Sequence, residues 1–208
     1  GKTTLFNCVS GLYPLTSGRI LFDGEDITSM SAHEVARRGM ARTFQVYVAS
    51  GDLSVQENVM VGCFMHTRSR AQAMANAKRI LSDLKLAEVS DFLVSELPVA
   101  SQKLVTMATA LGTGPKLLLL DEVAAGLNPS EVEDILGTIR HIHEDMGVTV
   151  MLIEHVMELV MKVSHRVIVL DYGQKIADGP PEVIARDQKV IKAYLGERFV
   201  REHAGEMS

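Results

Sequence analysis

The chain begins with Gly1-Lys2-Thr3-Thr4, which have the types and spacing of a phosphate-binding loop. In the pattern G-x-x-x-x-G-K-S/T, backbone N–H groups surround a triphosphate and a helix begins directly afterwards. Lys2 would then neutralise the β- and γ-phosphates, the Thr3 hydroxyl would bind Mg²⁺, and Thr4 would help to hold the α-phosphate. Gly1 corresponds to the second glycine of the pattern. We therefore expect the 208-residue sequence to be a fragment of a longer protein and to bind ATP weakly on its own.

A second candidate group follows the apolar run from Leu117 to Leu120, which predicts a buried strand ending in Asp121 and Glu122. Asp121 would hold the metal through water at the carboxyl end of this strand. Glu122 would accept a proton from the attacking water. By themselves the two carboxylates could also be an acidic turn after a buried strand. Their position downstream of the GKTT segment favours a nucleotide hydrolase.

The elements that must position these residues alternate between strands and helices. This order predicts an α/β fold with a mostly parallel sheet covered on both faces. Asp23-Gly24 is typical of a hairpin turn, and residues 171–174 of another turn. The strands are expected at residues 19–22, 40–45, 117–121, 148–153 and 166–170.

Helix starts are indicated by serines followed three residues later by glutamate, the capping-box pattern. These pairs are Ser31 with Glu34, Ser54 with Glu57, and Ser130 with Glu133. Ser101 is expected to cap a further helix that runs to Leu111. Further helices are predicted at residues 71–86 and 156–163. Residues 52–101 contain no convincing strand and predict an inserted α-helical subdomain, and residues 180–208 predict a helical C-terminal tail.

Composition excludes several classes of protein. The 208 residues are 47% hydrophobic and 23% charged, which is ordinary for one globular domain. A net charge of −5 argues against nucleic acid as a partner. No apolar run is long enough to span a bilayer, so we expect membrane contact only through partner proteins. Two cysteines without metal-site spacing fit a reduced, cytoplasmic location.

Several segments together resemble the ATP-binding subunits of ABC transporters, most closely the ATPases of branched-chain (hydrophobic) amino-acid importers. The resemblance covers nearly the whole chain and implies a P-loop NTPase (RecA-like) fold. It also implies one ABC ATPase domain over residues 1–208 that lacks its N-terminal strands, with ATP and Mg²⁺ as cofactors. The segments that carry it are residues 6–8, 41–45, 55–59, 117–122, 124–129, 153–155 and 193–196.

The resemblance implies roles for residues that would otherwise be unremarkable. Gln45 corresponds to a glutamine that binds Mg²⁺ and links the ATPase to the membrane subunit; without this context it would be a surface residue. His155 corresponds to a histidine that contacts the γ-phosphate, although alone it would be an ordinary helix-start residue. Ala125, Gly126, Leu127 and Asn128 occupy the D-loop, which in this family crosses a dimer interface.

The family's signature motif is altered here. It is L-S-G-G-Q, or in this branch often L-P-Y-G-Q-Q, and it acts on ATP held by the partner subunit. This chain has Leu97, Pro98, Val99, Ala100, Ser101 and Gln102 in its place. Ala100 adds a methyl group where a glycine allows close approach to the γ-phosphate. Thr109, Val123 and Val156 also depart from the family pattern.

Two functional hypotheses follow. The first is an ATPase that drives import of branched-chain or other hydrophobic amino acids, or related small solutes, on the inner face of the plasma membrane. Its partners would be transmembrane permease subunits and a second ABC ATPase subunit, identical or different. The alternative is a degenerate subunit that binds ATP and dimerises as a regulatory or structural module. The altered signature favours the alternative, whereas Glu122 and His155 favour the enzyme. The enzyme hypothesis requires Lys2, Asp121, Glu122 and His155 to converge around one magnesium-bound triphosphate.

Overall fold

The computed structural model describes residues 1–43 and 50–193. The chain divides into two compact units. The larger unit is Thr3–Glu154, and the smaller one combines Gly1–Lys2 with the chain from His155 onward. The predicted single domain and the bounds of its helical subdomain stay predictions.

The larger unit contains a parallel sheet of three strands, β3 (Met40–Arg42), β4 (Leu117–Asp121) and β5 (Thr149–Ile153), in the order β3-β4-β5. Met40 is paired with Leu117, and Asp121 with Ile153. The side chains from Leu118 to Leu120 are fully buried, as expected for a central parallel strand. The predicted α/β fold is confirmed, whereas residues 44 and 45 of the predicted second strand lie outside the described residues.

A small hairpin precedes the sheet. Strands β1 (Leu21–Phe22) and β2 (Glu25–Asp26) pair antiparallel. Asp23 and Gly24 join them with φ of 52° and 82°. Two positive φ values in a two-residue loop match the twist of a hairpin, so the turn predicted from Asp-Gly is confirmed.

One core cluster joins the sheet to the helix that follows the phosphate loop. It is formed around Phe6 of α1 (Lys2–Val9), Val35 of α2 (Ala32–Arg37) and Leu119 of β4, each at most 1% exposed. Ile27, Met40 and Ile153 complete its buried part. Burial of these side chains fixes the direction in which α1 leaves the start of the chain.

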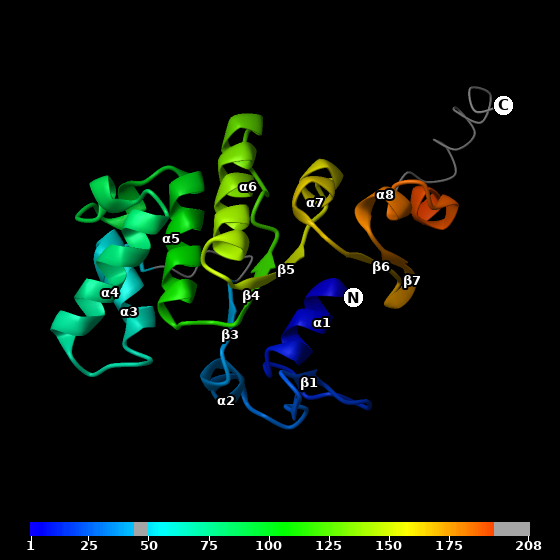
Figure 1. Ribbon diagram of the computed structural model, residues 1–208, viewed down its shortest axis with the longest axis horizontal. Coiled ribbons are helices and arrows are strands. Elements are labelled where there is room, and N and C mark those ends of the chain that lie inside the picture. Colours follow the sequence, from blue (N-terminus) through cyan, green and yellow to red (C-terminus); the bar gives the residue numbers. More distant parts are fainter. Residues whose placement is uncertain (44–49, 194–208) are drawn as a thin grey trace. The chain divides into compact units, whose positions relative to one another are not determined.

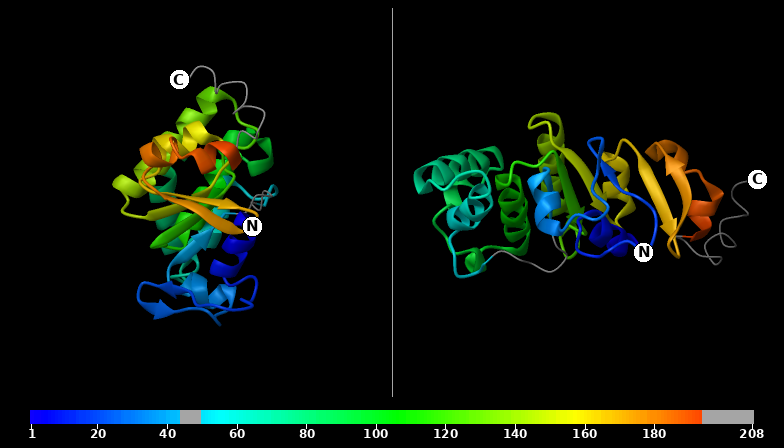
Figure 2. Two further views of the ribbon diagram at one scale, coloured as in Figure 1. Left: turned by 90° about the vertical axis from the view of Figure 1, so that its right-hand side faces the viewer. Right: turned by 90° about the horizontal axis from the view of Figure 1, so that it is seen from below.

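Three helices pack together beside the sheet: α3 (Val55–Cys63), α4 (Arg70–Asp83) and α5 (Val99–Gly112) (Figures 1 and 2). At the crossing of α3 and α5, a Cβ added to Gly62 would lie 2.0 Å from the carbonyl oxygen of Thr109. The two backbones therefore approach each other directly, which only glycine permits. The turns Ala87–Val89 and Val94–Glu96 connect α4 to α5.

The capping boxes at Ser31 and Ser54 are confirmed, but the starts of two other helices differ from the prediction. Helix α5 begins at Val99 after extended Pro98, so Ser101 lies inside its first turn and is not the cap. Helix α6 (Pro129–Glu144) is capped by Asn128, whose Oδ1 accepts from the Glu131 N–H at 3.0 Å. Pro129 suits the first helical position because its φ is already helical and its missing N–H costs no bond.

The smaller unit contains α7 (Met157–Val163), β6 (Val167–Asp171), β7 (Gln174–Gly179) and α8 (Pro181–Ile184). Strands β6 and β7 form an antiparallel hairpin around Tyr172 and Gly173, and α8 packs against it (Figures 1 and 2). The turn at 171–174 is confirmed, whereas β7 was not expected from its mixed polar sequence. The predicted tail is helical at Pro181–Ile184 and at 188–193, and residues 194–208 lie outside the described part.

Within residues 1–43 and 50–193, no helix combines the length and the apolar character needed to cross a lipid bilayer.

Candidate nucleotide site

Helix α1 begins at Lys2, directly after Gly1, as a phosphate-binding loop requires. Thr3 and Thr4 are exposed in its first turn. In the described chain this turn carries no acidic side chain. The N-terminal end of the helix thus presents backbone N–H groups and hydroxyl groups without a competing negative charge.

The two candidate carboxylates lie where β4 ends. Asp121 is 2% exposed, and Glu122 follows it with a φ of 52°. This left-handed conformation is strained for a residue with a long side chain. The Glu122 N–H donates to the carbonyl of Ile153 at 2.9 Å, which ties the bend to the end of β5.

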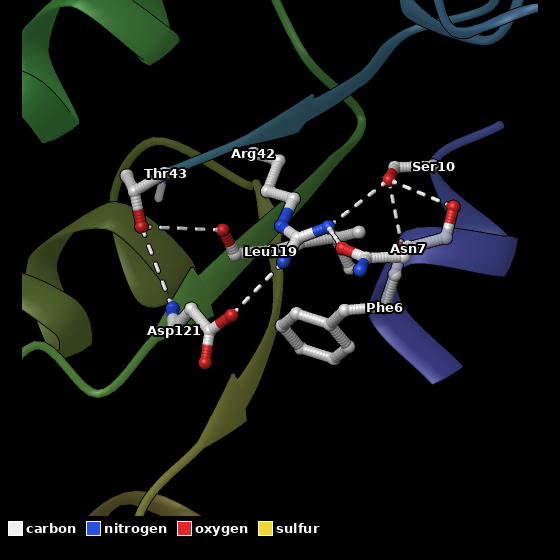
Figure 3. A network of polar contacts seen from close by, with 7 residues as sticks. All are labelled: Phe6, Asn7, Ser10, Arg42, Thr43, Leu119 and Asp121. Carbon is white, nitrogen blue, oxygen red and sulfur yellow. Dashed lines mark hydrogen bonds and ion pairs between the residues drawn. The ribbon is translucent and has the colours of Figure 1, made fainter. Parts of the chain in front are cut away.

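Asp121 takes part in a buried network with Arg42 of β3 (Figure 3). Nη2 of Arg42 donates to Oδ2 of Asp121 at 2.9 Å, and the two side chains are only 6% and 1% exposed. Nη1 donates to Asn7 Oδ1 at 2.6 Å and to Ser10 Oγ at 3.3 Å. The guanidinium also lies 5.6 Å from the ring centre of Phe6. Arg42 therefore joins α1, β3 and β4, a role that the sequence analysis did not assign to it.

The other oxygen of Asp121 fits a role in metal binding. Oδ1 is buried, and among the described residues it has no hydrogen-bond partner. The same residues contain no group of three or more His, Cys, Asp or Glu side chains that could hold a metal ion by themselves. Mg²⁺ is usually bound by one or two protein oxygens together with phosphates and water. Asp121 and the Thr3 hydroxyl fit that donor set, and Gln45, the third predicted ligand, lies outside the described residues.

The loop after Glu122 is held by two charged side chains that sequence reasoning missed. Buried Glu154 accepts a hydrogen bond from the Ala124 N–H at 2.9 Å. Lys103 donates to the carbonyls of Val123 at 2.9 Å and Ala125 at 2.6 Å. Burial lowers the pKa of the Lys103 ammonium below its usual range, while Glu154 and Glu122 oppose that shift.

The altered signature residues, 97–102, lie at the start of α5. Leu97 is buried, whereas Val99 is 57% exposed at the first helical position. Ala100 and Ser101 are half-buried in the first turn. The Gln102 side-chain amide donates to the Leu97 carbonyl at 2.7 Å. The substituted side chains thus stand at a helix N-terminus, the part of a helix that favours anions.

The remaining predicted residues come from the D-loop, from the start of α1 and from the chain just before α7. In the D-loop, Ala125 and Gly126 are exposed, while Asn128 serves as the cap of α6. His155 is exposed and stands just before α7. Lys2 and His155 fall in the smaller unit, whereas Asp121 and Glu122 fall in the larger one. Their convergence around one nucleotide stays a prediction.

Comparison with known proteins decides the family. A family model for ABC transporters matches residues 1–125. The chain belongs to this family. A model described as branched-chain amino acid ATP-binding cassette transporter matches residues 174–200 of this ABC protein.

Curated relatives agree with the assignment. The high-affinity branched-chain amino acid transport ATP-binding protein BraF of Pseudomonas aeruginosa is 39% identical, with 95% of this chain and 83% of the relative covered. The corresponding protein LivG of Escherichia coli K12 is 35% identical with the same coverage. Both relatives are named as ATP-binding proteins of amino-acid transport.

Solved ABC cassettes have the same fold. A nucleotide-free ATP-binding cassette from an ABC transporter superposes with a TM-score of 0.84 at 30% identity, covering 95% of this chain and 84% of the other. A cassette in its ADP conformation gives the same values. The P-loop NTPase fold is therefore confirmed. As a member of this family, the chain is a nucleotide-binding ATPase subunit of an ABC transporter.

Proposed function

We propose that the chain powers import of branched-chain or other hydrophobic amino acids, or related small solutes. The observation that supports this most directly is the match of residues 174–200 to the branched-chain amino acid cassette model. That segment lies beyond the part matched by the general ABC model, so it adds information about the subgroup. The names of BraF and LivG point to the same substrates.

Each candidate residue has a proposed role in ATP hydrolysis. Lys2, Thr3 and Thr4 bind the phosphates, and His155 contacts the γ-phosphate. Glu122 accepts the proton of the attacking water. Thr3, Gln45 and, through water, Asp121 would hold Mg²⁺, which when bound would supply neutralisation of charge on the β- and γ-phosphates.

The proposed working form is a dimer of ATPase subunits on transmembrane permease subunits, at the inner face of the plasma membrane. The signature residues, 97–102, then act on the partner's ATP, and residues 125–128 lie at the dimer interface. The methyl group of Ala100 weakens contact with the partner's γ-phosphate. The site built on Lys2 and Glu122 should therefore be the more active one when the partner has an intact signature.

Steady-state ATPase activity of the assembled complex tests this asymmetry. We expect Glu122→Gln to lower turnover by about 100-fold or more, because the general base contributes 10²–10⁴-fold. Ala100→Gly should leave the rate equal or raise it. Unchanged turnover in Glu122→Gln would support the degenerate-module alternative and would remove the role of this residue as the base.

Uptake measurements test the proposed substrates. The subunit, coexpressed with candidate permease and binding proteins, should support ATP-dependent uptake of labelled leucine by vesicles, and Glu122→Gln should abolish it. Labelled lysine provides the control, since its charged side chain does not match a hydrophobic solute. Transport of lysine without leucine would contradict the proposed substrate class but not the ATPase function.

A further inference from the structure

Lys103 makes an unusual set of contacts for a lysine. It lies in the first half of α5, one residue after the signature residues 97–102. Its Nζ donates to two main-chain carbonyls of a single loop, those of Val123 and Ala125. One cation thus binds the loop on both sides of Ala124. Such charge-assisted hydrogen bonds are roughly twice as strong as neutral ones.

Glu154 binds the same loop at the residue between these carbonyls. Its Oε1 accepts from the Ala124 N–H at 2.9 Å, and its side chain is buried at the end of β5. The Lys103 ammonium and the Glu154 carboxylate therefore bind main-chain groups within the same segment, residues 123–125. The segment is restrained from α5 and from β5 together.

The restrained loop begins directly after Glu122, whose backbone has a φ of 52°. A strained conformation of this kind persists only where the surrounding structure enforces it. Inside the loop, the Ala125 N–H donates to the Glu122 carbonyl at 3.3 Å, and the Leu127 N–H donates to the Ala124 carbonyl at 3.2 Å. Both of these bonds are long, so the contacts from Lys103 and Glu154 are the shorter restraints.

We propose that Lys103 is a positioning residue: through the carbonyls of Val123 and Ala125 it fixes the backbone that orients Glu122. This inference relies on the proposed role of Glu122 as the base. Lys103 does not need to contact nucleotide. Because it lies on the helix that begins at the signature residues, it also connects those residues mechanically to the base of its own subunit.

The test compares Lys103→Met with wild type in the assembled complex. Methionine keeps much of the apolar stem but removes the ammonium group. We expect kcat to fall about 10- to 100-fold, because a misplacement of a reacting group by about 1 Å can cost up to about 100-fold. ATP affinity should stay within about twofold, because the phosphates are bound by other residues. Hydrogen exchange should accelerate at the amides of 124–127.

Two further variants separate positioning from general stability. Lys116→Met is the matched control, since Lys116 is exposed and pairs with Asp23 on the β1–β2 turn; its kcat and exchange at 124–127 should equal those of wild type. Lys103→Arg retains a cation with several donors and should lie between wild type and Lys103→Met in both measurements. Faster exchange throughout α5 and β4 in Lys103→Met would assign Lys103 a general structural role and overturn the proposal.

Unchanged exchange at 124–127 together with unchanged kcat in Lys103→Met would also refute it. Failure of the proposed role of Glu122 as the base would give a different result from failure of the Lys103 proposal. If Glu122→Gln leaves turnover intact while Lys103→Met still accelerates exchange at 124–127, then Lys103 restrains the loop but Glu122 is not the base.

Discussion

At the scale of single residues, the most consequential feature is the buried pair of Arg42 and Asp121. Removing two charges from water costs several kcal/mol for each ion, and good geometry must offset that cost. Here the guanidinium also binds Asn7 and Ser10, so several of its donors are satisfied. The pair fixes one carboxylate oxygen of Asp121 while the other has no hydrogen-bond partner among the described residues.

Arg42→Met should therefore be strongly destabilising, because it leaves the Asp121 carboxylate buried without its cation. We expect a loss of about 3–5 kcal/mol in the free energy of unfolding. Urea denaturation of Arg42→Met, Asp121→Asn and the double variant measures it. The double variant should lose less than the sum of the single losses, and strict additivity would contradict a direct interaction between the two side chains.

This network shows where prediction from sequence stops. Arg42 and Asp121 are 79 residues apart, and no local pattern pairs a β3 arginine with one of many acidic residues. Asp121 itself was recognisable because it follows a run of leucines. Lys103 was equally hidden, because its partners are main-chain carbonyls that carry no residue-specific signal.

At the scale of elements, local patterns predicted most strands and helices but were ambiguous at two helix starts. Both Asn128 with Glu131 and Ser130 with Glu133 satisfy the capping-box spacing. Pro129 decides between them, because it favours the first helical position and so makes Asn128 the cap. Strand β7 escaped prediction because its pattern of burial is set by packing against α8 rather than by strict alternation of polar and apolar residues.

The crossing of α3 and α5 gives a prediction at this scale. Gly62→Ala places a methyl group against the Thr109 carbonyl and should destabilise the protein by about 1–3 kcal/mol. Gly137→Ala in α6 is the matched control, since among the described residues a Cβ at that position would meet nothing within 4 Å apart from its chain neighbours and the nearby backbone of α6 itself. It should stabilise by about 0.4–1 kcal/mol. Thermal or urea unfolding checks both, and equal effects would show that the crossing tolerates a side chain.

The β6–β7 hairpin gives a prediction about pH. Hydrogen bonds from Arg166 and then Lys175 hold the pKa of Asp178 well below its usual range. A lowered carboxylate pKa in the folded state stabilises it above the ordinary aspartate pKa, and this contribution disappears as the pH falls towards the folded-state value.

The difference in unfolding free energy between wild type and Asp178→Asn should therefore be larger at about pH 7 than at about pH 3. Urea denaturation at the two pH values measures it. The effect is expected to be small, because the cationic partners are largely exposed. A difference that does not change with pH would rule out this ion pair as its source.

At the scale of the whole molecule, the proposed active residues come from both compact units. If they act on one nucleotide, Mg-ATP must favour a single arrangement of the two units. The distance between two spin labels measures this arrangement. The labels are attached at exposed Val183 in the smaller unit and exposed Gly137 in the larger one, after Cys8 and Cys63 have been replaced so that they are not labelled. In the Glu122→Gln complex, Mg-ATP should narrow the distribution of label distances. A distribution that is equally broad with and without Mg-ATP would contradict convergence.

Because of the direct backbone contact at Gly62, we expect α3 and α5 to move together as one rigid pair. Neither helix can slide along the other without driving a carbonyl into a neighbouring main chain. If Lys103 positions the loop as proposed, we expect a displacement of α3 to move the first turn of α5 and, through Lys103, the bend at Glu122.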